Sequence, residues 1–257
     1  MSERLVPSIS LHDFEHRKEE ITKQLVDAAE NSGFFTLVNH ELTLDEIEAQ
    51  FAISRNFFDL PAMTKHSVRF DKTTSLGYEY KSQKRIATGT DQKESLLIQP
   101  NHHNYWPSNE IAPGFHETTQ SFLEKCAKIS QQVLSCFATT LGFPEDYFRD
   151  AMDDKKPDSL NQLRFLHYPG SKESVTQHEN GDPTFGAGTH TDFGCLTLLF
   201  QLDKGDGLEI CPGRESHTSG AMGDTFFPVP AKSGTIVVNL GDMLKLAIDL
   251  NVPGLRK

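Results

Sequence analysis

His190 and Asp192 are separated by one residue and stand between the glycine-rich residues 185–188 and an apolar run at residues 195–200. Side chains two residues apart in a strand lie on the same side of it, so this imidazole and this carboxylate can bind one divalent ion. Two histidines and one carboxylate form the facial triad that holds non-haem Fe(II) and leaves positions open for O2 and an organic co-substrate. The pair therefore predicts two of the three protein ligands of such a centre.

The third ligand has no clear candidate after this pair. The only later histidine, His217, falls among small and polar residues at 215–224, which we expect to form an exposed loop. Asp249 lies in a tail without a recognisable strand pattern, and we favour neither residue as a ligand. His102 and His103 are expected to be a solvated pair rather than a metal site.

The composition is that of a globular protein with a negative net charge. The 257 residues carry 25 Lys and Arg against 36 Asp and Glu, which gives a formal net charge of −11. Clustered Lys and Arg, which a phosphate-binding face needs, do not occur in the sequence, so we expect no nucleic-acid partner. No apolar run approaches membrane-spanning length, and the N-terminus lacks the apolar core of a signal peptide. We therefore expect no membrane partner and a cytoplasmic location.

The four cysteines lack the close spacing of a zinc site, and two of them fall inside a helical pattern. We expect all four to be reduced thiols rather than a disulfide framework. They are Cys126, Cys136, Cys195 and Cys211.

Hydrophobic periodicity predicts strand, helix, strand, helix over about the first 60 residues. Residues 6–11 and 34–40 alternate like strands, with a helical pattern between them. Thr43 and Glu46 form a capping box that opens the second helix. The first half therefore combines helices and strands.

The second half is mainly β. Residues 76–113 are irregular and interrupted by glycine and proline, and a long helix is predicted over residues 116–141. After residue 159 the hydrophobic period changes to two, and turn residues separate the apolar runs. Strands are predicted at 163–168, 196–202, 208–210, 226–229 and 235–240.

Several short motifs occur in a fixed order along the chain. In the first half they are Ser32-Gly33-Phe34-Phe35, Val38-Asn39-His40, Phe57-Phe58-Asp59-Leu60-Pro61 with Lys65, and Gly77-Tyr78. In the second half they are Leu166-His167-Tyr168-Pro169, Gly188-Thr189-His190-Thr191-Asp192-Phe193-Gly194 with Leu196-Thr197-Leu198-Leu199, Gly207-Leu208-Glu209-Ile210, Pro228-Val229-Pro230, and Val238-Asn239-Leu240-Gly241-Asp242-Met243. With these motifs the chain resembles the isopenicillin N synthase-like branch of the Fe(II)- and 2-oxoglutarate-dependent oxygenases, from about Val6 to Leu244.

The resemblance implies an α+β fold with a double-stranded β-helix core, a jelly-roll barrel, and N-terminal helices packed outside it. It divides the chain into an N-terminal non-haem dioxygenase region at 1–115 and, at 116–257, the long helix with the oxygenase barrel. We expect the two regions to form one structural unit.

The resemblance also implies an enzyme, a dioxygenase that uses Fe(2+), O2 and 2-oxoglutarate to oxidise a small-molecule substrate by hydroxylation, cyclisation or desaturation. It assigns His190 and Asp192 as metal ligands and Tyr168 as the residue whose hydroxyl contacts 2-oxoglutarate. The substrate pocket is expected to be lined by residues of the irregular region, namely Tyr78, Tyr80 and Ser95, and by residues at the mouth of the barrel such as Phe193.

The sequence after Leu244 departs from the family pattern. The family continues into a strand with the second iron histidine and then an Arg-x-Ser pair that grips 2-oxoglutarate, and neither is present. We expect a shortened chain with an unclosed barrel, lower stability, and self-association through the exposed strand edges. Two alternatives stay open: a catalytically inactive member that acts as a binding or regulatory module, and an oxygenase that does not use 2-oxoglutarate.

Overall fold

The computed structural model describes residues 6–81, 84–85, 89–169, 186–203, 205–212 and 225–251. These residues belong to two compact units. The first unit comprises Met1–Ile47, Glu124–Met152 and His190–Lys257, and the second comprises Glu48–Leu123 and Asp153–Thr189. Each unit is therefore assembled from stretches that lie far apart in the sequence.

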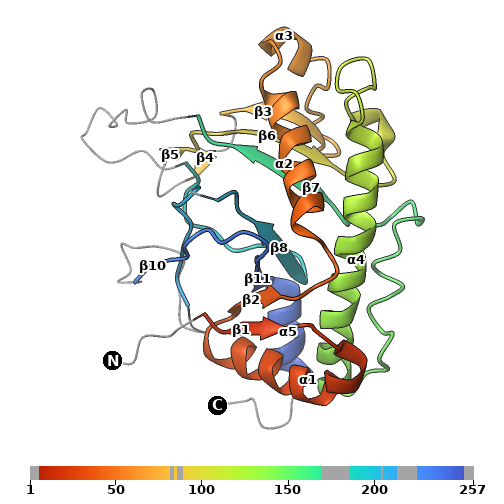
Figure 1. The fold of residues 1–257 in the computed structure, drawn as a ribbon, viewed down its shortest axis with the longest axis vertical. Helices are drawn as coiled ribbons and strands as arrows, with labels where there is room; N and C mark the ends of the chain where they lie inside the picture. Colours follow the sequence, from red (N-terminus) through yellow and green to blue (C-terminus); the bar gives the residue numbers. More distant parts are fainter. Residues whose placement is uncertain are drawn as a thin grey trace. The chain divides into compact units, whose positions relative to one another are not determined.

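A four-stranded sheet in the order β1-β2-β11-β8 forms the centre of the first unit (Figure 1). β1 (Ser8–Ser10) pairs in parallel with β2 (Phe34–Val38). β11 (Ile236–Leu240) pairs antiparallel with β2 on one side and with β8 (Leu196–Phe200) on the other. β11 is buried at every position except Asn239, as expected for a central strand.

The helix α1 (Phe14–Asn31) covers β1 and β2 with an apolar face that contains Ile21, Leu25 and Ala28. Gly33 ends the helix with φ +73°, and its amide donates to the Ala28 carbonyl. This left-handed conformation favours glycine and turns the chain directly into β2.

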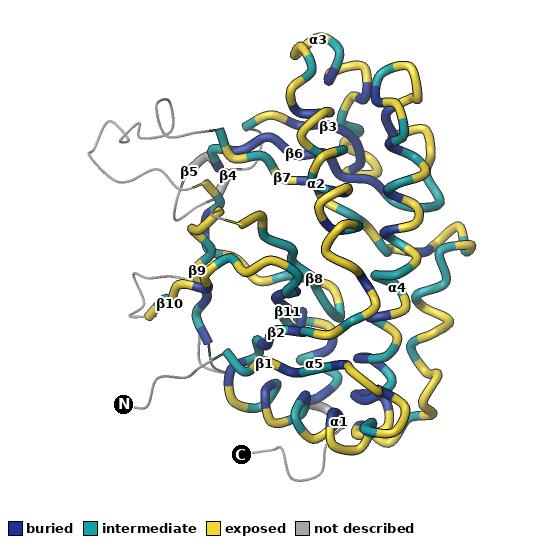
Figure 2. The backbone as a smooth tube through the Cα atoms, in the orientation of Figure 1, coloured by how far each residue is buried: buried dark blue, intermediate teal, exposed yellow. Residues whose placement is uncertain are grey.

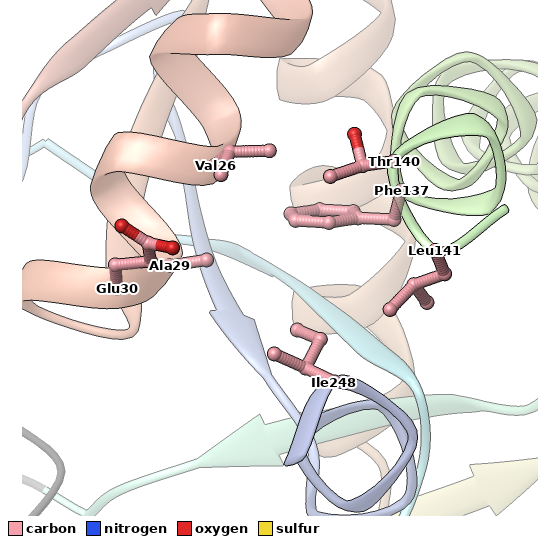
Figure 3. Close-up of a pocket in the computed structure, with 7 residues that line it drawn as sticks. All are labelled: Val26, Ala29, Glu30, Phe137, Thr140, Leu141 and Ile248. Carbon is pink, nitrogen blue, oxygen red and sulfur yellow. The ribbon is translucent and has the colours of Figure 1, made fainter. Parts of the chain in front are cut away.

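The helices α1, α4 (Phe115–Thr140) and α5 (Asp242–Asn251) meet around a small pocket in the first unit. Figure 3 shows side chains of all three helices around this space. α5 is amphipathic, with Leu244 and Ile248 buried and Met243 and Leu246 exposed. None of the residues that line the pocket is a predicted site residue; they are Val26, Ala29, Glu30, Phe137, Thr140, Leu141 and Ile248.

A short hairpin completes the described part of the first unit. β9 (Glu209–Ile210) pairs antiparallel with β10 (Phe227–Pro228). The predicted loop at 215–224 lies outside the described residues.

A three-stranded antiparallel sheet in the order β3-β6-β7 forms the second unit's centre. Its strands are β3 (Gly77–Tyr80), β6 (Glu94–Ile98) and β7 (Leu163–His167). Every residue of β6 is buried, and Figure 2 shows this central strand in dark blue. The remaining elements are α2 (Leu44–Phe58), which begins at the end of the first unit, α3 (Ala62–Lys65), β4 (Lys84–Arg85), β5 (Gly89–Thr90) and the 3-10 helix η1 (His103–Tyr105).

Aromatic side chains dominate the core of the second unit. Phe57 packs edge-on against Tyr78 with ring centroids 5.9 Å apart, and Phe115 packs against Phe165 at 5.4 Å. Trp106 lies edge-on to Phe115 and donates its indole N–H to the Gln99 carbonyl at 2.8 Å. Such rings bury large apolar areas, so this core stabilises the small sheet on which it packs.

The periodicity predictions are largely confirmed. The two N-terminal strands, the helices after them, the long helix and the five later strands all occur, with ends shifted by a few residues. The irregular region at 76–113 contains β3 and β6, which glycine and proline obscured in the sequence. The four cysteines are free thiols, and burial raises the pKa of Cys126 to about 12.

The described residues form a mixed arrangement of helices and sheets, and their strands do not close into a barrel. No helix among them is long and apolar enough to cross a membrane.

Candidate metal centre

His190 and Asp192 lie together on the segment that leads into β8. The His190 Nε2 atom is 3.7 Å from Asp192 Oδ1, and their side chains are 46% and 34% exposed. Bonds from imidazole nitrogen and carboxylate oxygen to zinc, a comparable divalent ion, are about 2.0–2.2 Å. One divalent cation can therefore contact both atoms, and the donor set fits Fe(II).

The other oxygen of Asp192 is held by two neighbouring strands. Thr197 Oγ1 on β8 donates to Oδ2 at 2.7 Å, and Asn239 Nδ2 on β11 donates to the same atom at 2.9 Å. Thr197 and Asn239 are directly opposed in the β8–β11 register. Their bonds fix the carboxylate with Oδ1 toward His190, which is the usual work of residues that support metal ligands.

The backbone of this segment is held by the junction between β11 and α5. The Asp242 amide donates to the Asp192 carbonyl at 2.8 Å, and the Gly241 amide donates to the Cys195 carbonyl at 3.0 Å. A Cβ atom at Gly241 would lie 1.9 Å from the Gly194 carbonyl oxygen, so only glycine allows this approach. The Thr191 hydroxyl adds a bond to the Asp242 carboxylate at 2.8 Å.

A third protein ligand is not assembled among the described residues, where no group of three or more His, Cys, Asp or Glu could hold a metal ion. His217 lies outside the described residues. Asp249 belongs to α5, but its side chain also lies outside what is described. The two predicted ligands lie close together, they stay a prediction, and the described residues offer no third ligand.

Tyr168, the predicted 2-oxoglutarate contact, follows the last residue of β7 in the second unit. Its side chain is exposed, with 46% of the residue surface accessible. A Cβ at Gly186 would lie 2.8 Å from Tyr168 Cδ1, so the glycine-rich run passes directly against the ring. Tyr168 therefore packs against Gly186, which lies four residues before His190 in the chain.

A buried polar network around Glu94, on β6, was not predicted from the sequence. Glu94 accepts hydrogen bonds from Lys65 Nζ at 2.7 Å, from the Tyr78 hydroxyl, and from His167 Nδ1 at 2.7 Å. Burial alone raises the pKa of Glu94, but these donors outweigh it and hold the pKa below its usual value. Burial and the neighbouring Glu94 raise the pKa of Tyr78.

The network corrects the expectation that Tyr78 and Ser95 line a substrate pocket. Tyr78 is only 3% exposed and bonds to Glu94, while Ser95 is buried and donates to Glu79 Oε1 at 2.9 Å. The register of β3 with β6 places the two side chains on opposite faces of the sheet, and each hydroxyl has a buried carboxylate as its partner. Phe193, by contrast, is 87% exposed beside Asp192.

Comparisons with known proteins identify the family of this chain. Residues 6–113 match the family described as non-haem dioxygenase in morphine synthesis N-terminal, and residues 160–249 match the 2OG-Fe(II) oxygenase superfamily. A 2-oxoglutarate-dependent dioxygenase of Aspergillus rugulosus, ecdK, is 32% identical over 86% of this chain and 69% of its own length. The chain belongs to the 2OG-Fe(II) oxygenase superfamily.

Other members of the superfamily are similarly close. The proline hydroxylase buaE of Petromyces alliaceus is 30% identical, covering 95% of this chain and 75% of its own. A full-length Neurospora crassa protein, solved with alpha-KG and thymine, is 29% identical with a TM-score of 0.76, covering 95% and 76% of the two chains. These similarities confirm the predicted jelly-roll oxygenase fold.

Membership in the 2OG-Fe(II) oxygenase superfamily also confirms the predicted chemistry. The chain is an oxygenase that uses Fe(II) and 2-oxoglutarate, and its relatives bind or oxidise small molecules. A binding module without catalysis and an oxygenase without 2-oxoglutarate are not favoured. Bound Fe(II) with 2-oxoglutarate supplies the oxidising power, because the co-substrate is converted to succinate and CO2 as O2 is reduced.

Proposed function

We propose that His190 and Asp192 are the iron ligands of this oxygenase and that Tyr168 contacts its 2-oxoglutarate. The carrying observation is the orientation of Asp192, whose Oδ1 faces His190 Nε2 while Oδ2 is occupied by Thr197 and Asn239. A carboxylate with one oxygen held and the other directed at an imidazole is arranged to bind a cation rather than to form a structural ion pair.

The protein's part in the reaction is to orient and to shield. His190 and Asp192 hold the metal at the start of β8, while the Tyr168 hydroxyl donates to an oxygen of the co-substrate. The exposed Phe193 ring beside the ligands offers an apolar surface to the substrate. The substrate is therefore a small organic molecule with an apolar part, as in the isopenicillin N synthase-like branch to which we assign the chain.

An anaerobic titration tests the assignment. Fe(II) and 2-oxoglutarate added to the wild-type chain should produce the weak visible charge-transfer band of the chelate, and O2 should then release succinate. The band should be lost in His190→Ala and Asp192→Ala. Tyr168→Phe should bind Fe(II) normally but require more 2-oxoglutarate.

The matched control is His12→Ala, which removes an exposed imidazole from the first unit. It should give the wild-type band. An unchanged band in Asp192→Ala, in protein that remains folded by circular dichroism, would show that the iron is held elsewhere.

We also propose that the outer edge of β8 mediates self-association. Among the described residues β8 is an edge strand of its sheet, next to β11, and edge strands are the part of a sheet that can pair with another chain. Size-exclusion chromatography should show a concentration-dependent dimer. A monomer at every concentration would refute this.

A further inference from the structure

The second unit contains a buried ion pair that the proposed chemistry does not use. Asp91 and Lys93 are 2% and 5% exposed, and Lys93 Nζ lies 2.9 Å from Asp91 Oδ2. Charged side chains are rarely buried so completely, and a pair in this position is not expected to add much net stability. The contacts of the pair indicate what else it does.

The other oxygen of Asp91 indicates this role. Asp91 Oδ1 accepts a hydrogen bond from the Gly188 amide at 2.9 Å, across 97 residues of sequence. Lys93 occupies Oδ2, so the carboxylate is fixed between a cation and a backbone donor. A charge-assisted bond of this kind is about twice as strong as one between neutral groups.

Gly188 belongs to residues 186–188, which we call the approach segment. At its first residue the segment passes so close to the Tyr168 ring that a Cβ on Gly186 would clash with it. At its last residue it is bound by Asp91, and His190 follows two residues later in the chain. The segment is thus fixed at both ends beside one predicted cofactor contact and immediately before a predicted metal ligand.

We propose that Asp91, held by Lys93, is a positioning residue for the cofactor site. It restrains the glycine-containing approach segment at Gly188, and so keeps Tyr168 packed and His190 ready to bind metal. The inference rests on the proposed roles of His190 and Tyr168. It adds that the metal affinity depends on a carboxylate that never touches the metal.

Metal binding by the metal-free protein provides the main test, with Mn(II) as a redox-inactive probe in calorimetry. Asp91→Ala removes the acceptor and should weaken Mn(II) binding about tenfold, at the lower end of the effect of residues that support metal ligands. Asp91→Asn keeps an oxygen for the Gly188 amide and should retain most of the affinity. In the same metal-free protein, hydrogen exchange at the Gly188 amide should accelerate in Asp91→Ala and less in Asp91→Asn.

Thr119→Val is the matched control, because it removes a buried hydrogen bond from Gln50 in the same unit without touching the approach segment. It should lower the melting temperature and leave Mn(II) affinity unchanged. If Asp91→Ala folds and binds Mn(II) like the wild type, or if Thr119→Val weakens binding equally, Asp91 is structural only and the inference is wrong. If Asp91→Ala does not fold, the same criterion applies to Lys93→Met, which should weaken Mn(II) binding while Thr119→Val does not.

The design separates this inference from the proposed function. A wild-type chain that does not bind Mn(II), or that binds it equally in His190→Ala, would overturn the proposed site and the inference together. Wild-type binding that is lost in His190→Ala but unchanged in Asp91→Ala would overturn the inference alone.

Discussion

Asp192 in the first unit and Glu94 in the second are both carboxylates held by side chains from neighbouring strands, yet they are prepared for different tasks. Asp192 is 34% exposed at its side chain, two neutral donors bind its Oδ2 atom, and its Oδ1 atom faces His190. Glu94 is 7% exposed at its side chain and accepts from a lysine, a tyrosine and a histidine. A half-exposed carboxylate whose second oxygen faces an imidazole is suited to bind a cation, whereas a buried carboxylate with charged and polar donors stabilises the core around it.

The largest effect should follow from Glu94→Ala in the second unit. The change leaves the Lys65 ammonium buried without its carboxylate, and breaking a buried ion pair in this way costs about 3–5 kcal/mol in the free energy of unfolding. Urea unfolding measures this loss. The control is Lys128→Ala, whose exposed pair with Glu41 should contribute less than about 1 kcal/mol. Equal losses in the free energy of unfolding would mean that Glu94 stabilises the second unit no more than an exposed ion pair does.

Gly241→Ala should produce a smaller loss in the first unit. The added methyl group would lie 1.9 Å from the Gly194 carbonyl oxygen, so the β11–α5 junction must shift, at a cost of about 1–3 kcal/mol. The same shift moves the backbone that carries Asp192, so metal affinity should fall together with the melting temperature. Gly114→Ala is the control for a glycine with positive φ and no nearby atoms, and it should leave metal affinity unchanged.

Asn239→Leu tests most directly whether Asp192, unlike Glu94, is held in place for metal binding rather than for stability. It removes one donor from Asp192 Oδ2 without leaving a buried charge unpaired, so the free energy of unfolding should change little. Metal affinity should fall about 10- to 100-fold, which corresponds to about 1.4–2.7 kcal/mol. Mn(II) calorimetry on Asn239→Leu and Thr197→Val measures the effect. Unchanged affinity in both variants would mean that Asp192 needs no support from β8 and β11.

There is a physical reason why some of these residues could be predicted from the sequence and others could not. His190 and Asp192 were predicted from their spacing and from the family motif around them, although in the structure they lie before β8 and not within a strand. Thr197 and Asn239 stand in quoted motifs, but their meeting at Oδ2 depends on the register of β8 with β11, which local patterns do not contain. The sequence therefore predicted the pair of candidate ligands but not the residues that support Asp192.

The Glu94 network could not be predicted for the same reason, because its members also lie far apart in the sequence. Its donors come from α3, β3 and β7, at positions 65, 78 and 167. The charged residues directly before the apolar run of β6 were the available signal, since charges entering a buried strand need partners. The predicted helices and most strands were found because periodicity is local, whereas β3 was obscured by the irregular composition around it.

The smallest effect concerns a carboxylate that is neither ligand nor buried anchor. Glu46 closes the predicted capping box with Thr43 and pairs with Lys125, and these bonds, led by the lysine, lower its pKa to about 2. Because the pKa is lower in the folded state than in the unfolded state, its contribution is complete above about pH 4.5 and is lost as the pH falls through about 2. Glu46→Gln should therefore be slightly less stable than the wild type at pH 7, and the difference in melting temperature should shrink progressively below pH 4.5. A constant difference across this range would mean that the loss of stability in Glu46→Gln does not come from the charge of Glu46.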